Sequence, residues 1–233
     1  VTYGFDPEAD VRATDLEQSG PRMSFKLWLP EAEVGIAVNL MQPGRHNVLN
    51  ALGAAAVAWE LGIDADGIVK GLAAFQGIGR RFARIGELKV RRGQVLAFED
   101  YGHHPTELDA VLRAARCGWP DKRLVLVFQP HRYTRTRDQF DAFARVLAEA
   151  DALMLLDLYA AGEAPIAGID SDALAREINA RRDLTLERVA KIGDVADRLD
   201  ALCHDGDLLL VMGAGDVGQL AEQLRASTQE AAA

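Results

Sequence analysis

The feature that most constrains the fold is a set of continuously apolar runs in the C-terminal two thirds of the chain. Segments such as RLVLVFQ and DLLLVMG contain almost only apolar residues. A strand with one face in water alternates apolar and polar residues, whereas a parallel strand covered by helices on both faces does not. The runs therefore predict buried strands at 94–99, 123–128, 152–158 and 207–212, with a weaker one at 184–189.

Segments with helical spacing of apolar residues lie between or after these runs. They are 105–116, 134–150, 171–182, 194–203 and 216–226. Alternating strands and helices predict right-handed crossovers and an α/β, Rossmann-like doubly wound sheet that is mostly parallel. In such sheets ligands bind at the carboxyl ends of the strands. We therefore expect a site in the polar loops EDYGHHPTE, QPHRYTRTRD and DLYAAGEAP, each of which follows a predicted strand.

The N-terminal third has a different spacing of apolar residues. Short apolar runs up to about residue 42 are separated by Gly, Pro and acidic residues, which predicts antiparallel strands or hairpins. Helical spacing follows in residues 43–63 and again in residues 65–75, and Gly62 is expected to end the first of these helices.

The segment QGIGRRFARIGE, residues 76–87, is rich in Gly and Arg and predicts a hinge between two domains. We therefore expect one domain before this segment and another after it. The chain starts with VTYGFDPEAD, without an initiator methionine, and reads as the edge of a strand. This start predicts that the chain begins inside a larger protein.

Composition excludes several classes of protein. Apolar residues make up 49% and charged residues 26%, as in ordinary globular proteins, and the net charge of −9 argues against a nucleic-acid binder. No apolar run approaches the roughly 20 residues of a membrane span. The first residues lack the features of a signal peptide, so we expect a cytoplasmic protein. Cys117 and Cys203 have no CxxC spacing and are read as reduced thiols.

The loop after the first buried strand contains Glu99, Asp100, Tyr101, His103 and His104. Three interpretations compete: a metal site, a loop that caps a helix, and a loop that contacts a ligand. Adjacent side chains diverge, so one metal ion is not expected to hold both histidines, and we expect no metal site. The position of the loop at a strand end favours contact with a ligand.

The loop after the second buried strand contains His131, Arg132, Arg135 and Arg137. Surface charge is the ordinary explanation for exposed arginines. In an acidic chain, however, several arginines directly after a buried strand favour an anion-binding loop, because the planar guanidinium matches carboxylate and phosphate groups.

Two further motifs are ambiguous from the residues alone. Asn47 and Asn50 share one face near the start of a helix, next to His46. Their side chains either hydrogen-bond to the amide-like edge of a ligand such as adenine or cap the helix. The segment GAGDVG, residues 213–218, matches the dinucleotide pattern GxGxxG. Too few residues follow it for the acidic residue that this pattern needs, so we interpret it as a tight turn near the rim of a site.

The motifs GRHNVLNALGAA, GIGRRF, DYGHHPTE, GWPDKRLVLVFQPHRYTRTRD, AGEAPIAGIDS and GAGDVG together resemble the Mur ligase family. They occur in the family's order and cover most of the chain. The resemblance is strongest to the members that add L-alanine. It implies the latter part of a central ATPase domain in residues 1–82 and a C-terminal Rossmann-like domain in residues 83–233.

The resemblance also implies a reaction and its residues. ATP phosphorylates the carboxylate of UDP-N-acetylmuramate, and L-alanine attacks the acyl phosphate to form an amide in peptidoglycan biosynthesis. Catalytic residues stay unassigned, including which histidine, if any, takes a proton from the amine. The residues implied to bind ATP are His46, Asn47, Asn50, Arg81 and Asp100. Those implied to bind the other substrates are Tyr101, His103, His104, His131, Arg132 and Arg135.

The chain departs from the family pattern in what it lacks. The GKT phosphate loop is absent from the sequence, as are the region that supplies a magnesium ligand and the UDP-binding domain. We therefore expect a portion that is inactive alone, with the Mg²⁺ ligands mostly outside this chain. Alternative readings are a related murein-peptide ligase, a non-catalytic adenine-nucleotide-binding module, and an oxidoreductase built around GAGDVG.

Overall fold

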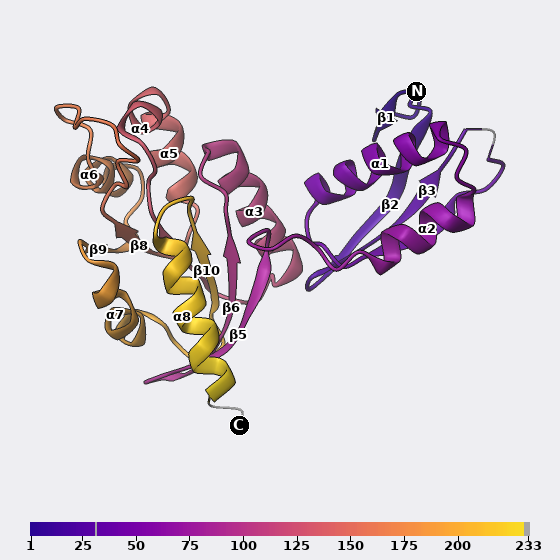
Figure 1. Ribbon diagram of the computed structural model, residues 1–233. Helices are drawn as coiled ribbons and strands as arrows, with labels where there is room; N and C mark the ends of the chain where they lie inside the picture. The colour runs from indigo at the N-terminus through magenta and orange to yellow at the C-terminus, as the bar shows by residue number, and fades with distance from the viewer. Residues whose placement is uncertain (31, 231–233) are drawn as a thin grey trace. The chain divides into compact units, whose positions relative to one another are not determined.

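The computed structural model describes residues 1–30 and 32–230, which form two compact units. The first unit comprises Val1–Gly77 and Arg113–Pro120, and the second comprises Ile78–Leu112 and the described residues from Asp121 onward. Each unit has its own sheet and its own apolar core (Figure 1).

The first unit contains a four-stranded sheet in the order β1-β2-β3-β4. The predicted antiparallel pairing is confirmed between β2, β3 and β4, but it is wrong for β1, which runs parallel to β2. The reason is that residues 5–10 form a returning loop instead of a hairpin turn, with the N–H of Val11 bonded to the carbonyl of Thr2. The strands are β1 (Tyr3–Gly4), β2 (Val11–Ser19), β3 (Arg22–Trp28) and β4 (Ile36–Leu40).

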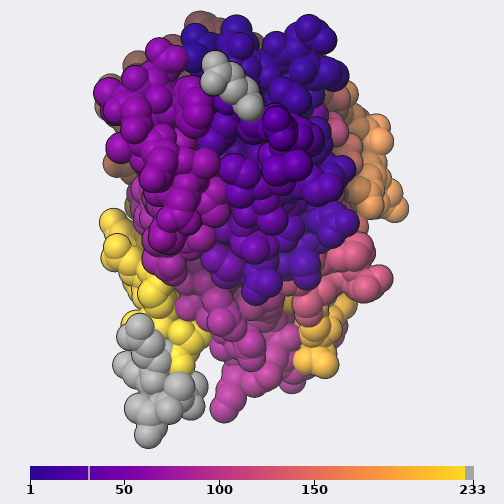
Figure 2. All heavy atoms as spheres, turned by 90° about the vertical axis from the view of Figure 1, so that its right-hand side faces the viewer, coloured from indigo at the N-terminus to yellow at the C-terminus, as the bar shows by residue number. Residues whose placement is uncertain are grey.

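Two helices, α1 (Arg45–Glu60) and α2 (Ala65–Ala74), pack on this sheet. Helix α1 buries Val48, Leu52 and Ala55, whose spacing places them on one face against the strands. Gly62 follows α1 with a φ of 79°, a left-handed conformation that glycine adopts without strain, so the predicted end of this helix is confirmed. Figure 2 shows one face of this unit in indigo to purple.

The second unit contains a six-stranded sheet in the order β5-β6-β10-β7-β8-β9. All neighbouring strands pair in parallel except β5 and β6, which form an antiparallel hairpin, so the predicted mostly parallel sheet is confirmed. The strands are β5 (Ala83–Val90), β6 (Gly93–Asp100), β7 (Leu124–Phe128), β8 (Ala152–Leu156), β9 (Thr185–Val189) and β10 (Leu208–Met212).

Helices cover both faces of this sheet (Figure 1). Buried residues of α7 and α8 pack with alternate residues of the strands on one face. On the other face Phe128 of β7 contacts Phe143 of α5, with 5.8 Å between ring centroids. The helices from residue 105 onward are α3 (Pro105–Gly118), α4 (Tyr133–Asp138), α5 (Phe140–Leu147), α6 (Ser171–Arg181), the short 3-10 helix η1 (Ile192–Asp194), α7 (Val195–Leu202) and α8 (Val217–Glu230). The part of α3 from Arg113 belongs to the first unit.

Two predictions for this unit need correction. The expected hinge at 76–87 overlaps strand β5, which the sequence pattern missed because a register shift around Ile85 breaks the two-residue alternation. The single helix expected at 134–150 is two helices that meet at Gln139, whose φ of −118° is not helical. The two helices differ in burial. Within α4 only Thr136 is buried, whereas α5 packs an apolar face against the sheet.

The ring of Phe143 is fully buried, so its truncation tests the core of the second unit. We expect Phe143→Ala to lower the free energy of unfolding by about 3–5 kcal/mol, because it removes apolar contacts and leaves a cavity. Chemical denaturation measures this loss. The control is Phe75→Ala, at a residue that is 41% exposed. An equal effect at both positions would contradict the described packing.

Candidate functional site

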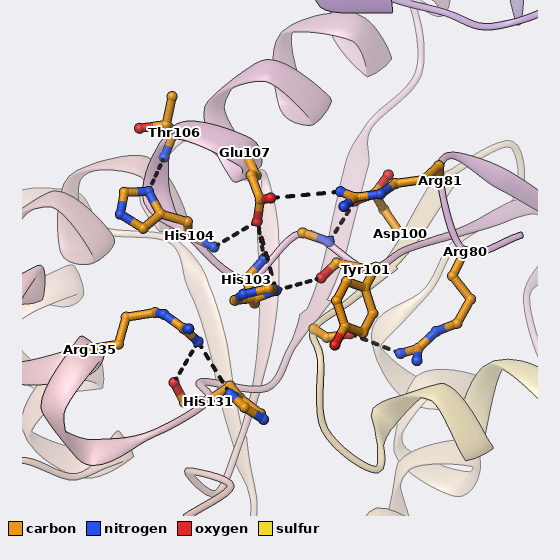
Figure 3. Close-up of polar contacts among 12 residues, drawn as sticks. Arg80, Arg81, Asp100, Tyr101, His103, His104, Thr106, Glu107, His131 and Arg135 are labelled. Atoms are coloured by element: carbon orange, nitrogen blue, oxygen red, sulfur yellow. Dashed lines mark hydrogen bonds and ion pairs between the residues drawn. The ribbon is translucent and has the colours of Figure 1, made fainter. Parts of the chain in front are cut away.

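Loops that follow β6, β7 and β8 converge at the carboxyl edge of the second sheet. Figure 3 shows residues of the first two loops. His103 follows β6 and His131 follows β7, and their ring centroids are 5.9 Å apart. Tyr159 follows β8 and stacks on His131 at 5.4 Å with 11° between the ring planes. Residues far apart in sequence are thus neighbours here, because parallel strands end at the same edge of the sheet.

Asp100 ends β6 and is only 5% exposed. Its two carboxylate oxygens accept backbone N–H groups on opposite sides: Oδ1 from Gly102 at 2.6 Å and Oδ2 from Phe82 at 2.8 Å. Burial raises the pKa of the Asp100 carboxyl above its ordinary value, although these N–H groups and the charge of Arg81 act in the opposite direction. The carboxylate therefore joins the end of β6 to the segment that precedes β5.

That preceding segment has an unusual backbone. Arg80 and Phe82 have φ values of 60° and 45°, a left-handed region that side chains other than glycine rarely adopt. The carbonyl of Arg80 accepts the N–H of Tyr101 at 2.7 Å, and the Arg80 guanidinium lies 4.6 Å from the centroid of the Tyr101 ring. Arg81, between them, lies 3.7 Å from Glu107. Contacts to the loop after β6 thus hold the strained segment in place.

Glu107 organises the double-histidine loop, and the sequence analysis did not single it out. Its Oε2 accepts the backbone N–H of His103 at 2.9 Å and of His104 at 3.1 Å. Partial burial raises the pKa of Glu107, but these N–H bonds and the charges of His103 and Arg81 outweigh it, and the pKa lies below its ordinary value. A glutamate at the third position of a helix that accepts the N–H of the residue before the helix is the glutamate half of a capping box. That spacing was the available sequence signal, although His104 stands where the usual Ser or Thr would.

The two adjacent histidines have different partners (Figure 3). The Nδ1 of His103 lies 3.0 Å from the carbonyl oxygen of Tyr101, and its ring is edge-on to the Tyr101 ring. The Nδ1 of His104 instead accepts the N–H of Thr106 at 3.4 Å, in the first turn of α3. His104 thus helps to cap α3, one of the interpretations that the sequence left open, whereas His103 faces the loop after β7.

The loop after β7 places a guanidinium beside a histidine. The Nη1 of Arg135 lies 3.2 Å from Nδ1 of His131 and 3.1 Å from the carbonyl oxygen of the same residue. In the described part of the chain, the other N–H groups of Arg135 have no hydrogen-bond partner. They form a fork that matches a carboxylate or phosphate.

Partial burial lowers the pKa of His131, and the neighbouring charges of Arg135, His103 and Arg132 lower it further, whereas Glu163 acts in the opposite direction. His131 is therefore neutral near pH 7. Because the folded state binds a proton at this ring less readily than the unfolded chain does, this group reduces stability as the pH falls through the ordinary histidine range.

The loop after β8 supplies two residues that were not predicted, Tyr159 and Glu163. The carbonyl of Tyr159 accepts the N–H of Arg132 at 2.8 Å. Glu163 accepts both the N–H and the hydroxyl of Thr134, and lies 3.6 Å from Nη1 of Arg132. The hydrogen bonds from the Thr134 N–H and hydroxyl hold the pKa of Glu163 below its ordinary value. Glu163 thereby fixes the start of α4.

The segment GAGDVG forms the turn between β10 and α8, as predicted for a tight turn near the rim of the site. Gly213 has a φ of 144°, and its N–H donates to the carbonyl of Asp100. At Gly215 a side chain would collide with Gln129 and with Tyr159. The glycines here allow close packing of the loops.

The remaining predicted residues belong to the first unit and are described separately. Gly44 begins α1 without a side-chain cap, so Asn47 and Asn50 do not cap it by accepting N–H groups. The Nδ2 of Asn47 donates to the carbonyl of Pro43 at 2.8 Å, and the Nδ2 of Asn50 donates to Oδ1 of Asn47 at 3.4 Å. The ring of His46 lies against Gly44. The two asparagines share one face, as the sequence predicted.

The described residues contain no group of three or more His, Cys, Asp or Glu side chains placed to hold a metal ion. Within residues 1–30 and 32–230, no helix combines the length and apolar character needed to cross a membrane. The arrangement at the carboxyl edge offers guanidinium forks, two histidine rings and a buried carboxylate, which together suit an anionic substrate with a reactive group nearby.

The first test of this site concerns Asp100. We expect Asp100→Asn to lower the free energy of unfolding by about 1–3 kcal/mol, because an amide NH₂ would replace one of the two acceptors and face a backbone N–H. Denaturation measures the change. The control is Asp138→Asn, at an exposed side chain paired with Arg137. A more stable Asp100→Asn variant would show that the cost of burying the charge exceeds the value of the two bonds.

The second test concerns His131. We expect Arg135→Met to raise the pKa of His131 toward its ordinary value of 6.5, because it removes an adjacent positive charge. Titration of the histidine resonances by NMR measures the shift. Arg137→Met removes a charge from the same helix that pairs with Asp138, and it should leave the pKa unchanged. No response to Arg135→Met would mean that the charge of Arg135 does not contribute to lowering the pKa of His131.

Comparison with known proteins places these motifs in context. A family model described as Mur ligase, glutamate ligase domain, matches residues 80–215. The chain is 56% identical over 225 residues to UDP-N-acetylmuramate–L-alanine ligase of Xanthomonas campestris pv. campestris (strain B100), an alignment that covers 96% of this chain and 47% of that protein. The identity to the same-named ligase of Xylella fastidiosa (strain M23) is 55% with equal coverage. The chain thus spans about half the length of the curated relatives it matches.

Solved structures agree at the level of the fold. UDP-N-acetylmuramate–alanine ligase of Thermotoga maritima superposes with a TM-score of 0.78 at 22% identity, over 99% of this chain and 48% of that chain. A murein peptide ligase of Psychrobacter arcticus 273-4 superposes with a TM-score of 0.62, also at 22% identity, over 96% of this chain and 46% of that chain. Because the family model covers more than half of the 233 residues, the chain belongs to the Mur ligase family.

Proposed function

We propose that this chain is part of an ATP-dependent ligase that joins L-alanine to UDP-N-acetylmuramate through an acyl phosphate in peptidoglycan biosynthesis. The names of the relatives at 55–56% identity support the choice of substrates. Because those relatives are about twice as long as the aligned region, the proposal concerns a protein of which this chain supplies one portion.

The observation that carries the proposal is the meeting of His103, His131 and the Arg135 fork at one edge of the sheet. An amino acid presents a carboxylate and an amine a few atoms apart. The unused guanidinium donors of Arg135 suit the carboxylate, and the histidine rings, 5.9 Å apart, suit the amine and the reacting group. Tyr101, His104 and Arg132 complete the proposed substrate-binding set.

The residues proposed to bind the nucleotide occur in both units, and each group is described within its own unit. In the second unit, Arg81 lies within the strained segment that precedes β5, and Asp100 accepts a hydrogen bond from that segment. In the first unit, the first turns of α1 contain His46, Asn47 and Asn50. Asn50 is exposed and retains an amide acceptor for an adenine edge. Both carboxylate oxygens of Asp100 accept backbone N–H groups, so contact with a ribose hydroxyl would use their remaining lone pairs.

The proposed domain assignment follows from this function. Residues 1–82 would form the latter part of an ATPase domain and residues 83–233 a C-terminal Rossmann-like domain. Mg²⁺ would neutralise phosphoryl charge, with ligands mostly outside this chain. Since the reaction consumes ATP and a UDP-sugar, we propose a cytoplasmic location, with a role in cell-wall formation, cell shape and division.

The function is tested with the protein encoded by the complete reading frame. Release of phosphate should require ATP, UDP-N-acetylmuramate and L-alanine together, and the product should contain a new amide bond.

The second candidate function is a ligase that adds a peptide, because this chain shares its fold with a murein peptide ligase. Phosphate release with a murein peptide but not with L-alanine would favour that candidate. Binding of ATP without turnover of either substrate would favour a non-catalytic nucleotide-binding protein.

The sharpest single substitution is Arg135→Ala in that protein. We expect the KM for L-alanine to rise about 10-fold to 100-fold, as for the loss of a charged hydrogen bond, while the KM for ATP changes little. Steady-state kinetics measure both constants. Arg137→Ala, on the same helix but paired with Asp138, is the control. Equal losses for both substrates would contradict a role in holding the amino acid.

A further inference from the structure

The hydrogen-bond partners of His103 and His131 determine which ring nitrogen of each carries the proton. Each ring has one nitrogen against a group whose own role cannot change, a guanidinium for His131 and a backbone carbonyl for His103. A guanidinium only donates and a carbonyl only accepts. The geometry therefore assigns opposite tautomers to two neighbouring rings.

At His131 the fixed partner is a donor. Nη1 of Arg135 lies 3.2 Å from Nδ1, and the arginine keeps its charge at all ordinary pH values. Nδ1 must therefore present its lone pair, and the proton of the neutral ring is on Nε2. Stacking on Tyr159 fixes the plane of the ring and hence the direction of this N–H. His131 thus offers a hydrogen-bond donor at Nε2.

At His103 the fixed partner is an acceptor. The carbonyl oxygen of Tyr101 lies 3.0 Å from Nδ1, so Nδ1 carries the proton and Nε2 has a free lone pair when the ring is neutral. The Oε2 of Glu107 lies 3.8 Å from the same Nδ1. This arrangement of a carboxylate, an imidazole and an open nitrogen is that of a proton acceptor.

The two open nitrogens belong to neighbouring rings. The centroids of His103 and His131 are 5.9 Å apart, and among the described residues no group hydrogen-bonds to Nε2 of either ring. His104 differs, because its Nδ1 is occupied in capping α3 and its ring points away from the other two (Figure 3). One acceptor and one donor are therefore available close together.

We infer that His103 accepts a proton from the amino group of the incoming amino acid, while the Nε2–H of His131 donates to the carboxylate of that amino acid beside Arg135. The inference deepens the proposed function and rests on it, because it assigns the proton transfer of the same reaction. It also separates the two roles by residue: His103 acts on the reacting nitrogen, and His131 binds the substrate.

In the proposed step, the amine nitrogen forms a bond to the acyl carbon. The bond from that carbon to the phosphoryl oxygen breaks, so phosphate leaves with the electron pair. An ammonium group loses two protons on becoming a secondary amide. One passes to Nε2 of His103, which later releases it to water, and the other is carried away by the phosphate.

The decisive kinetic experiment compares two nucleophiles in the protein from the complete reading frame. We expect His103→Gln to lower kcat with L-alanine by about 100-fold or more, the usual range for loss of general base catalysis. Hydroxylamine, which is largely unprotonated at neutral pH, needs no such base and should still be converted at a rate close to that of the unaltered protein. That retained reaction also shows that the variant is folded and forms the acyl phosphate.

Two results would overturn the assignment of His103. One is a kcat with L-alanine that stays within about threefold of the unaltered protein, below the usual range for such catalysis. The other is an equal loss with L-alanine and with hydroxylamine. The control is His204→Gln, at an exposed histidine that precedes β10 and so lies toward the opposite edge of the sheet. It should leave both rates unchanged.

For His131, substitution by glutamine distinguishes a hydrogen-bond donor from a general base. Glutamine can place an amide N–H near the position of Nε2, so His131→Gln should retain most of kcat with a modest rise in the KM for L-alanine. His131→Ala, which has no donor, should raise that KM further. A loss of kcat in His131→Gln that is absent in His103→Gln would exchange the two roles and contradict the inference.

The tautomers can be measured independently of turnover. Long-range proton–nitrogen NMR spectra of the histidine rings, assigned with the two glutamine variants, should show protonation of Nδ1 in His103 and of Nε2 in His131. The reverse pattern at either ring would overturn the inference even in an active enzyme. Absence of L-alanine-dependent phosphate release would instead refute the proposed function and leave the tautomers as measured.

Discussion

The structure of the second unit depends on a sheet whose parallel strands are buried on both faces. Strands such as Leu124–Phe128 and Leu208–Met212 have no exposed residue, so polar side chains can emerge only beyond their ends. Because the parallel strands point the same way, the loops after β6, β7, β8 and β10 meet at one edge. Apolar burial thus determines where polar chemistry can collect, before any particular polar residue is considered.

At that edge, buried or shielded carboxylates hold the backbone in place. Asp100 joins the end of β6 to the strained segment around Arg80 and Phe82, Glu107 fixes the two adjacent histidines, and Glu163 fixes the start of α4. Each accepts backbone N–H groups, so each keeps a loop in one conformation. The cationic and imidazole side chains that these loops present are therefore held in one arrangement, as the proposed function would require of a site that acts by positioning.

The sequence allowed most strands and helices of the second unit to be predicted, because continuous apolar runs and helical spacing are local patterns. It missed β5, where a register shift breaks the alternation, and it joined α4 to α5 across Gln139. Among site residues, the polar loops singled out after strands do meet at one edge. Glu107, Tyr159 and Glu163 lie in these loops but were not singled out, because their roles depend on contacts with Arg81, His131 and Arg132 that only the fold creates.

The sequence by itself determined the α/β class, the burial of the parallel strands, the order of the motifs and the resemblance to the Mur ligase family, since all of these are encoded in residue type and spacing. The tertiary structure decided the roles of the individual side chains. His103 and His104 are neighbours in sequence, yet one faces His131 and the other caps α3. The tautomer of each ring depends on the donor or acceptor beside it, and the fold brings Arg135 and the carbonyl of Tyr101 to those positions.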